Sequence, residues 1–168
     1  GACLHAGGID LMGCARSEII EVEKVVSISS LNQLKGISVQ PDGSLKIGAM
    51  TALAEIAAHP AITGKYNVLA QAAASVGSPQ IRQQGTIGGN LCQRPRCWYF
   101  RTDIQCLKKG GARCYAASGE NQYHAVFGGS PCFYVHPSDV AGALVALQAQ
   151  LSIAGPGGNK VVRIEDFF

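Results

Sequence analysis

Apolar positions in the first third of the chain fall in short runs that indicate a mixed α+β structure. The run at residues 23–29 is apolar-rich and short, which predicts a β-strand. Residues 37–49 contain two β-prone runs separated by Pro41, Asp42 and Gly43, which are residues that favour tight turns. The pattern therefore predicts a single strand followed, after a turn or short helix, by a β-hairpin.

The pattern then changes to a helical period. Residues 51–60 predict a helix that begins at Thr51 as N-cap and ends before Pro60, which cannot continue a helix from within. Residues 66–77 are rich in alanine and predict a second helix, closed by Gly77. The first half of the chain is thus expected to mix strands and helices.

Residues 78–136 follow neither period and are rich in Gly, Pro, Cys and Arg. Irregular segments of this length inside a domain are uncommon and are usually functional or cross-linked. Regular structure returns at residues 136–150, where Ser138 is placed as the N-cap of a helix and Val140, Ala143, Leu144 and Leu147 share one face. The end of the chain predicts a hairpin turning at residues 155–159.

Composition narrows the class of protein. The chain has 168 residues, of which 47% are hydrophobic and 15% charged, so it can bury a core and is not expected to be disordered. The net charge of +3 is too small to indicate a nucleic-acid-binding protein. No apolar run approaches the roughly 18–20 residues of a membrane helix, and no signal peptide is recognisable. The chain begins without Met and in mid-pattern, so we expect it to be a piece of a longer protein.

Two compact glycine motifs stand far apart in the sequence, "AGGIDLMG" at residues 6–13 and "GTIGGNL" at residues 85–91. Either could be a tight turn. Alternatively, Gly7–Gly8 and Gly88–Gly89 let backbone N–H groups converge on an anion such as a pyrophosphate. Neither motif matches the dinucleotide fingerprint of a Rossmann fold or a P-loop. Two such loops favour a dinucleotide held between two lobes.

Five motifs together carry a family resemblance: "AGGIDLM", "GAMTALAEI", "IRQQGTIGGNL", "HPSDVAGALVAL" and "IEDFF", in this order. The chain resembles the FAD-binding subunit of the molybdenum hydroxylases, the group that contains xanthine dehydrogenase and the aldehyde oxidoreductases. The resemblance implies an α+β fold of the p-cresol methylhydroxylase and vanillyl-alcohol oxidase type, with FAD between two lobes. Residues 1–168 are then one FAD-binding domain, truncated at both ends relative to the family.

The resemblance also implies which residues bind the cofactor. The first glycine loop corresponds to the part of the family that wraps the pyrophosphate, the second loop supplies further contacts, Asp139 matches an acidic residue at the cofactor, and Val76 matches a position near the flavin. The implied cofactor-binding residues are Ala6, Gly7, Gly8, Ile9, Asp10, Leu11, Val76, Thr86, Gly88, Gly89, Asn90 and Asp139. Two features depart from the family: Ile9 replaces a usual threonine, and the strand before the first loop is almost wholly missing.

Seven cysteines are present, and four of them, Cys97, Cys106, Cys114 and Cys132, lie in an irregular insert at about residues 92–135. Four thiolates at uneven spacing suit a 4Fe–4S cluster, and the arginines and lysines of the insert would offset its negative charge. The flanking sequences resemble the subgroup that carries such a cluster, as in periplasmic-type aldehyde oxidoreductase and 4-hydroxybenzoyl-CoA reductase. The resemblance therefore implies a 4Fe–4S cluster on these four cysteines.

Other interpretations of the insert stay open. Structural zinc takes four cysteines, though usually in closely paired knuckles. Disulfides are a second alternative, against which the odd cysteine count argues. A basic loop with Trp98, Tyr99 and Phe100 could also stack on single-stranded nucleic acid; we instead expect these aromatic rings to shield the cluster. Cys92 is expected to be buried, or to line the space between flavin and cluster, without binding metal.

The resemblance implies a function in electron transfer. Substrate oxidation, of an aldehyde or aromatic compound, would take place on a molybdopterin-containing large subunit, and electrons would pass through the 2Fe–2S clusters of a small subunit to FAD and then to an external acceptor. We expect no catalytic side chain in this chain, no nucleic-acid partner and no membrane contact. The expected compartment is the cytoplasm, or the periplasm if a partner subunit is exported with it. The alternative function is a zinc- or cluster-stabilised interaction module without flavin.

Overall fold

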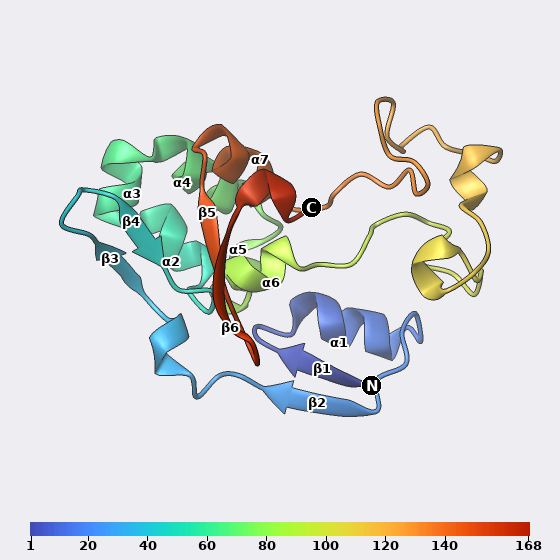
Figure 1. The fold of residues 1–168 in the computed structure, drawn as a ribbon, viewed down its shortest axis with the longest axis horizontal. Helices are drawn as coiled ribbons and strands as arrows, with labels where there is room; N and C mark the ends of the chain where they lie inside the picture. The colour runs from blue at the N-terminus through green and yellow to red at the C-terminus, as the bar shows by residue number, and fades with distance from the viewer.

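The computed structural model describes residues 1–168. Its elements form three regions: an N-terminal unit at residues 1–28, a helical unit that contains the main core, and a Cys-rich segment at residues 92–137 (Figure 1). The three sheets have two strands each, one of them parallel and two antiparallel. The architecture is therefore mixed α/β.

The N-terminal unit is a strand–helix–strand motif. Strand β1 (Ala2–His5) pairs in parallel with β2 (Lys24–Ser27), with Ala2 opposite Lys24 and His5 opposite Ser27. The helix α1 (Ile9–Arg16) connects them. The strand β2 was predicted, but β1 and α1 were not, because the glycine motif at residues 6–13 indicated a loop and α1 begins within it. The expectation that the strand before the first glycine loop is almost wholly missing is corrected to a strand of four residues.

A short 3₁₀ turn, η1 (Asn32–Leu34), leads to the hairpin of β3 (Ile37–Val39) and β4 (Leu45–Ile47). Asp42 orders its turn, since its carboxylate accepts hydrogen bonds from the backbone N–H and the hydroxyl of Ser44 at 2.9 and 2.7 Å. Gly43 has φ of +77°, a conformation that favours glycine. The predicted hairpin is confirmed, and Asp42 and Gly43 form its turn as expected.

The helical unit contains α2 (Leu53–Ala58), α3 (Pro60–Lys65), α4 (Asn67–Ser75) and α5 (Pro79–Gln84). The prediction of Thr51 as N-cap is wrong: Ala52 holds that position, and the Thr51 hydroxyl donates to the Gly36 carbonyl at 3.0 Å. Pro60 does end α2, but it also starts α3, because the first position of a helix needs no N–H donor. The expectation of irregular backbone from residue 78 is wrong for α5 and for α6 (Ile87–Leu91).

The chain leaves the helical unit after α6 and returns at α7 (Asp139–Ala146). Between them lie only two 3₁₀ turns, η2 (Leu107–Lys109) and η3 (Tyr115–Ala117). Ser138 caps α7 as predicted, accepting from the backbone N–H of Ala141 at 3.1 Å. Its hydroxyl also donates to Asn90 Oδ1 at 2.5 Å, which joins the two ends of the Cys-rich segment. The segment is thus a long excursion that starts and ends at one place.

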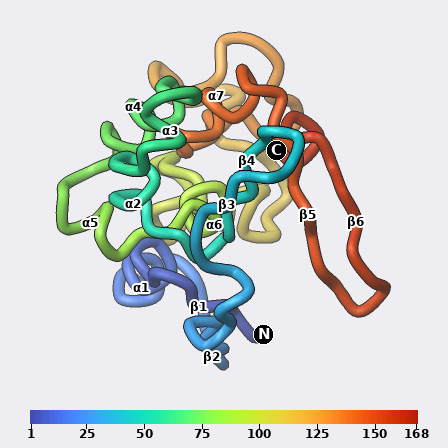
Figure 2. Tube along the Cα trace, turned by 90° about the vertical axis from the view of Figure 1, so that its left-hand side faces the viewer, coloured from blue at the N-terminus to red at the C-terminus, as the bar shows by residue number.

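The chain finishes with the predicted hairpin, β5 (Gln150–Gly155) and β6 (Gly158–Arg163), followed by η4 (Ile164–Asp166). Figure 2 shows this hairpin on the side of the molecule away from α2 and α5. No helix has the length and apolar character needed to cross a lipid bilayer.

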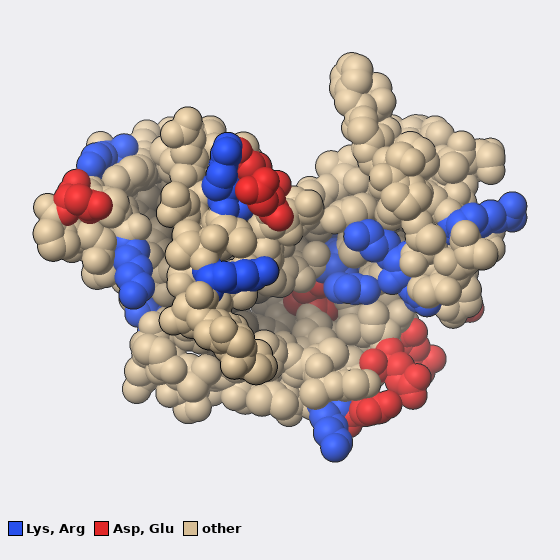
Figure 3. Space-filling model, in the orientation of Figure 1, with Lys and Arg blue, Asp and Glu red and all other residues tan.

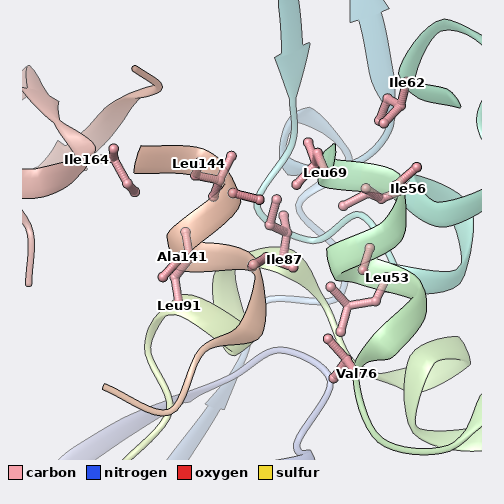
Figure 4. Packing of buried hydrophobic residues seen from close by; sticks show 14 residues of the cluster. Leu53, Ile56, Ile62, Leu69, Val76, Ile87, Leu91, Ala141, Leu144 and Ile164 are labelled. Carbon is pink, nitrogen blue, oxygen red and sulfur yellow. The ribbon is translucent and has the colours of Figure 1, made fainter. Parts of the chain in front are cut away.

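Two separate cores hold these regions. The main core contains fourteen buried residues from α2, α3, α4, α6, α7 and η4, and Figure 4 shows Leu53, Leu69, Ile87 and Leu144 converging within it. The second core is small and contains Cys14, Ile19, Phe100 and Cys106. Its members come from the N-terminal unit and from the Cys-rich segment, so these two regions pack on each other and not on the main core.

Candidate cofactor site

A cleft with a volume of about 580 Å³ lies between the N-terminal and helical units. Both glycine motifs contribute to its wall. Of the twelve cofactor residues implied by the sequence, all except Gly88 line it: Ala6, Gly7, Gly8, Ile9, Asp10, Leu11, Val76, Thr86, Gly89, Asn90 and Asp139. Ala6 and Asp139, which are 133 positions apart in the sequence, are therefore brought to one cleft.

The first glycine loop connects β1 to α1. Gly8 is the N-cap of α1 with φ of +74° and no side chain bonds to the first turn of the helix, which leaves backbone N–H groups available at the cleft. Such a helix start favours an anion. The motif therefore does open a helix after a strand, although it lacks the spacing of the dinucleotide fingerprint.

Gly7 also serves the contact between the two units. A Cβ atom on this residue would collide with the backbone carbonyl oxygen of Gln84, at the end of α5. The Gln84 side chain in turn donates from Nε2 to the Gly7 carbonyl at 3.2 Å. Glycine is required here by the approach of another backbone segment, in addition to any approach of a ligand.

The second glycine loop is the start of α6. Thr86 caps this helix by accepting from the Gly89 N–H at 3.1 Å. Gly88 faces away from the cleft: its N–H donates to the Ala49 carbonyl at 2.9 Å, and a Cβ atom there would lie 2.9 Å from Ala49 Cβ. The structure thus gives Gly88 a packing role, while Thr86 and Gly89 lie on the cleft wall.

Gln93, Arg94 and Arg96, which the sequence did not indicate, also line the cleft. Cys92 lines it too, as one of the two expectations for this residue had it. Figure 3 shows Lys and Arg side chains gathered where the Cys-rich segment faces the N-terminal unit. Arg94 and Arg96 are close enough to the glycine loops to attract an anion in the cleft. Their position just after the second glycine motif is the sequence feature that could have predicted them. The pKa of the Cys92 thiol is raised because the surrounding wall desolvates it, although part of the side chain is exposed.

The four cysteines singled out in the sequence surround one small hollow. Cys97, Cys106, Cys114 and Cys132 all line it, although they are spread over 36 residues of irregular chain. Aromatic rings form much of the remaining wall, namely those of Tyr99, Phe100, Tyr115, His124 and Tyr134. No group of three or more His, Cys, Asp or Glu side chains converges closely enough to hold a single metal ion.

The surroundings of the hollow are cationic and poorly hydrated. Burial raises the pKa of the Cys132 thiol. The nearby thiols of Cys114 and Cys106 raise it further, whereas a backbone hydrogen bond at Tyr134 and the charge of Lys108 oppose the increase. Lys108 itself lies over the Tyr134 ring, 4.5 Å from its centre. The thiols are thus close enough to disfavour one another's charged form, a situation that a bound cation reverses.

The hollow and the cleft share one stretch of backbone. Arg94 and Arg96 line the cleft, whereas Pro95 and Cys97 line the hollow. Consecutive Cα atoms are about 3.8 Å apart, so the walls of the two sites are separated by little more than one chain thickness. Any groups bound in both places would be close neighbours.

The whole chain, residues 1–168, matches the family described as the FAD binding domain in molybdopterin dehydrogenase. It is 37% identical over 172 residues to the FAD-binding subunit of an aldehyde oxidoreductase of Escherichia coli (strain K12), an alignment that covers 100% of this chain and 54% of that subunit. It is 41% identical over 86 residues to the FAD subunit of nicotinate dehydrogenase from Eubacterium barkeri, covering 51% of this chain and 29% of the relative. The chain thus spans about half the length of the first of these relatives and less of the second.

The fold is similar to solved structures of a carbon monoxide dehydrogenase and a quinoline 2-oxidoreductase. A chain of carbon monoxide dehydrogenase from Hydrogenophaga pseudoflava superposes with a TM-score of 0.70 at 24% identity, covering 99% of this chain and 44% of that one. A chain of quinoline 2-oxidoreductase from Pseudomonas putida 86 superposes with a TM-score of 0.66 at 21% identity, covering 99% and 46%. At these identities the similarity concerns the fold. With the family match over its full length, the chain belongs to the FAD-binding domains of the molybdopterin dehydrogenases.

Proposed function

We propose that the chain is the electron-transfer flavin subunit of a molybdenum-containing oxidoreductase, with FAD in the cleft and a 4Fe–4S cluster in the hollow. The observation that carries the proposal is the shared wall of residues 92–97, which lies between a dinucleotide-sized cleft and a ring of four cysteines. Two adjacent carriers on one stretch of backbone are suited to passing electrons between them.

The cleft suits FAD through its backbone. The first turn of α1 presents backbone N–H groups, Thr86 and Gly89 add polar wall, and Arg94 and Arg96 offset the charge of a diphosphate. Leu53, Val76 and Ile81 supply apolar surface for a flat ring system. Bound FAD would accept electron pairs and release electrons singly, chemistry that no side chain of this chain supplies. The role of the protein is to bind, orient and exclude water.

The hollow suits a cluster better than a zinc ion. In a structural zinc site the four sulfurs lie about 2.3 Å from one centre, so they must converge closely. The four cysteines line one hollow but are separated in the sequence by eight, seven and seventeen residues, whereas structural zinc usually takes closely paired cysteines. Arg113 and Lys108 lie nearby against Tyr115 and Tyr134 and would offset the negative charge of the cluster.

The subgroup with the extra cluster is favoured by the extent of the alignments. The aldehyde oxidoreductase subunit aligns with 100% of this chain, Cys-rich segment included, whereas the nicotinate dehydrogenase subunit aligns with 51%. We further propose that the full-length protein works with a molybdopterin-containing large subunit and a small subunit with 2Fe–2S clusters, where an aldehyde or aromatic substrate is oxidised. Electrons would reach FAD from the small subunit and leave to an external acceptor.

An absorbance spectrum of the full-length protein, purified without oxygen, tests the proposal. Flavin produces resolved bands in the near-UV and blue, and a 4Fe–4S cluster adds a broad shoulder that dithionite bleaches. Metal analysis on the same sample should find iron and acid-labile sulfide in equal amounts. A colourless protein with one zinc per chain would overturn the proposal in favour of a zinc-stabilised interaction module.

A further inference from the structure

Arg101 connects the Cys-rich segment to the helix that follows the first glycine loop. Within its own segment, its guanidinium donates to the carbonyls of Pro95 and Arg94, at 2.8 and 3.1 Å. On α1 it lies 3.0 Å from Asp10 Oδ1 and 2.9 Å from the sulfur of Cys14. The planar guanidinium of Arg101 thus bonds acceptors on the Cys-rich segment and on α1 at the same time. The single ammonium group of a lysine cannot reproduce this arrangement.

The carboxylate of Asp10 is fully engaged by this contact. Its Oδ1 pairs with Arg101, with Arg96 at 3.7 Å, and its Oδ2 accepts the backbone N–H of Arg94 at 2.6 Å. The side chains of Asp10 and Arg101 are 15% and 20% exposed, so water competes little for this pair. Asp10 belongs to the glycine loop by sequence, but its carboxylate is directed to the Cys-rich segment. An unpaired carboxylate at this position would repel a bound diphosphate.

The buried residues next to this contact also join α1 to the Cys-rich segment. Cys14 and Phe100 are 0% and 1% exposed and belong to the small second core, which has no residue from the helical unit. Cys106 is in this core, and Cys97 packs against it. The position of α1, and with it the first glycine loop, therefore depends on the segment that carries the four cysteines.

We propose that the Asp10–Arg101–Cys14 contact couples the two sites: an ordered Cys-rich segment holds the first glycine loop in the conformation that binds FAD. The inference rests on the placement of FAD proposed above. Arg101 acts as a positioning residue, because it does not line the cleft and acts through Asp10 and α1. Coupling between binding sites is reciprocal, so bound FAD also stabilises the order of the Cys-rich segment.

The test is an FAD titration of the full-length protein after removal of its flavin, followed by flavin fluorescence, with iron content measured on each sample. Arg101→Met should weaken FAD affinity by about 5- to 150-fold, the usual range for coupled sites. The matched control is Arg163→Met. Arg163 lies at the end of the terminal hairpin and pairs with Glu165, so its removal should leave the affinity for FAD unchanged. If Arg101→Met does not fold, Arg101→Lys replaces it with the same expectation, since lysine keeps the charge but loses the bonds on one side.

A double-mutant cycle separates coupling from a general loss of stability. Asp10→Asn combined with Arg101→Met should weaken FAD binding no more than the stronger single variant, because both remove one contact. Additive effects, or an Arg101 variant that binds FAD as the unsubstituted protein does, would overturn the inference while leaving the FAD site standing. A full-length protein that binds no FAD at all would instead overturn the proposed function, and the inference with it.

Discussion

The imidazole of His124 lies against the sulfur of Cys97, with 3.1 Å between Nε2 and Sγ. The ring is 8% exposed and is packed edge-on against Trp98, with 5.4 Å between ring centres. A histidine held this firmly against one candidate cluster ligand acts as a hydrogen-bond partner of that sulfur.

This contact predicts an effect on the reduction potential of the proposed cluster. A donor to a cysteine sulfur stabilises the added negative charge of the reduced cluster, so its loss lowers the potential. For His124→Phe we expect a decrease on the order of 60 mV, since one hydrogen bond to a charged group contributes about 1.5 kcal/mol. A redox titration followed by electron paramagnetic resonance measures it. His124→Gln keeps a donor and should restore part of the potential; equal potentials in all three proteins would contradict this role.

Serine substitutions test three of the four candidate ligands against a cysteine outside the hollow. Cys97→Ser, Cys114→Ser or Cys132→Ser should each lower iron and sulfide content to a small fraction of the unsubstituted value, because oxygen replaces a thiolate ligand. Cys3→Ser is the control, since Cys3 lies on β1 and lines the cleft, not the hollow. Unchanged iron in any of the three ligand variants would show that the ligand set is different.

Gly7 predicts a loss of stability that is separate from any ligand. Gly7→Ala places a methyl group against the Gln84 carbonyl, and we expect a decrease of about 1–3 kcal/mol in the free energy of unfolding. The control is Gly13→Ala on α1, where nothing lies within 4 Å of the added carbon. Because alanine favours a helix interior, this control should raise stability by about 0.5–1 kcal/mol. Urea denaturation of both variants provides the comparison.

Ser138 predicts a second stability effect, at the two ends of the Cys-rich segment. Ser138→Ala removes the cap of α7 and leaves the buried Asn90 Oδ1 without its donor, so we expect a decrease of about 1–3 kcal/mol in unfolding free energy. Ser75→Ala removes an exposed hydroxyl that bonds only the Ala72 carbonyl and should change stability by less than about 0.5 kcal/mol. Similar losses for the two variants would argue against the Asn90–Ser138 bond as a structural link.

Cys92 predicts the pH dependence of a chemical modification. Because desolvation raises the pKa of this thiol, its thiolate appears only at a pH above that of an ordinary cysteine. Alkylation by iodoacetamide should therefore be slow at neutral pH and accelerate as pH rises through the raised pKa. Since Cys92 lines the cleft, bound FAD should slow the reaction at every pH, as mass spectrometry of the modified peptide would show. Equal rates with and without FAD would argue against FAD at this wall.

Some secondary-structure elements could be predicted from the sequence, because neighbouring residues alone specify them. The β3–β4 turn follows from Asp42 and Gly43, the cap of α7 from Ser138, and the terminal hairpin from its glycines. The two glycine motifs also led to the cleft, because they contain the backbone positions that must stay open. These features depend on a few neighbouring residues and on backbone conformations that only certain amino acids adopt readily.

The tertiary structure decided what depends on distant partners. The sequence predicts Thr51 as a helix cap, but its hydroxyl donates to the carbonyl of Gly36 in the preceding loop. The sequence places Asp10 in a predicted phosphate-binding loop, but its carboxylate pairs with Arg101, 91 residues later. The irregular Cys-rich segment has no period from which its path could be predicted, and its four cysteines come to line one hollow in a segment that packs on α1. Long-range hydrogen bonds, ion pairs and burial assign these roles, and no local pattern encodes them.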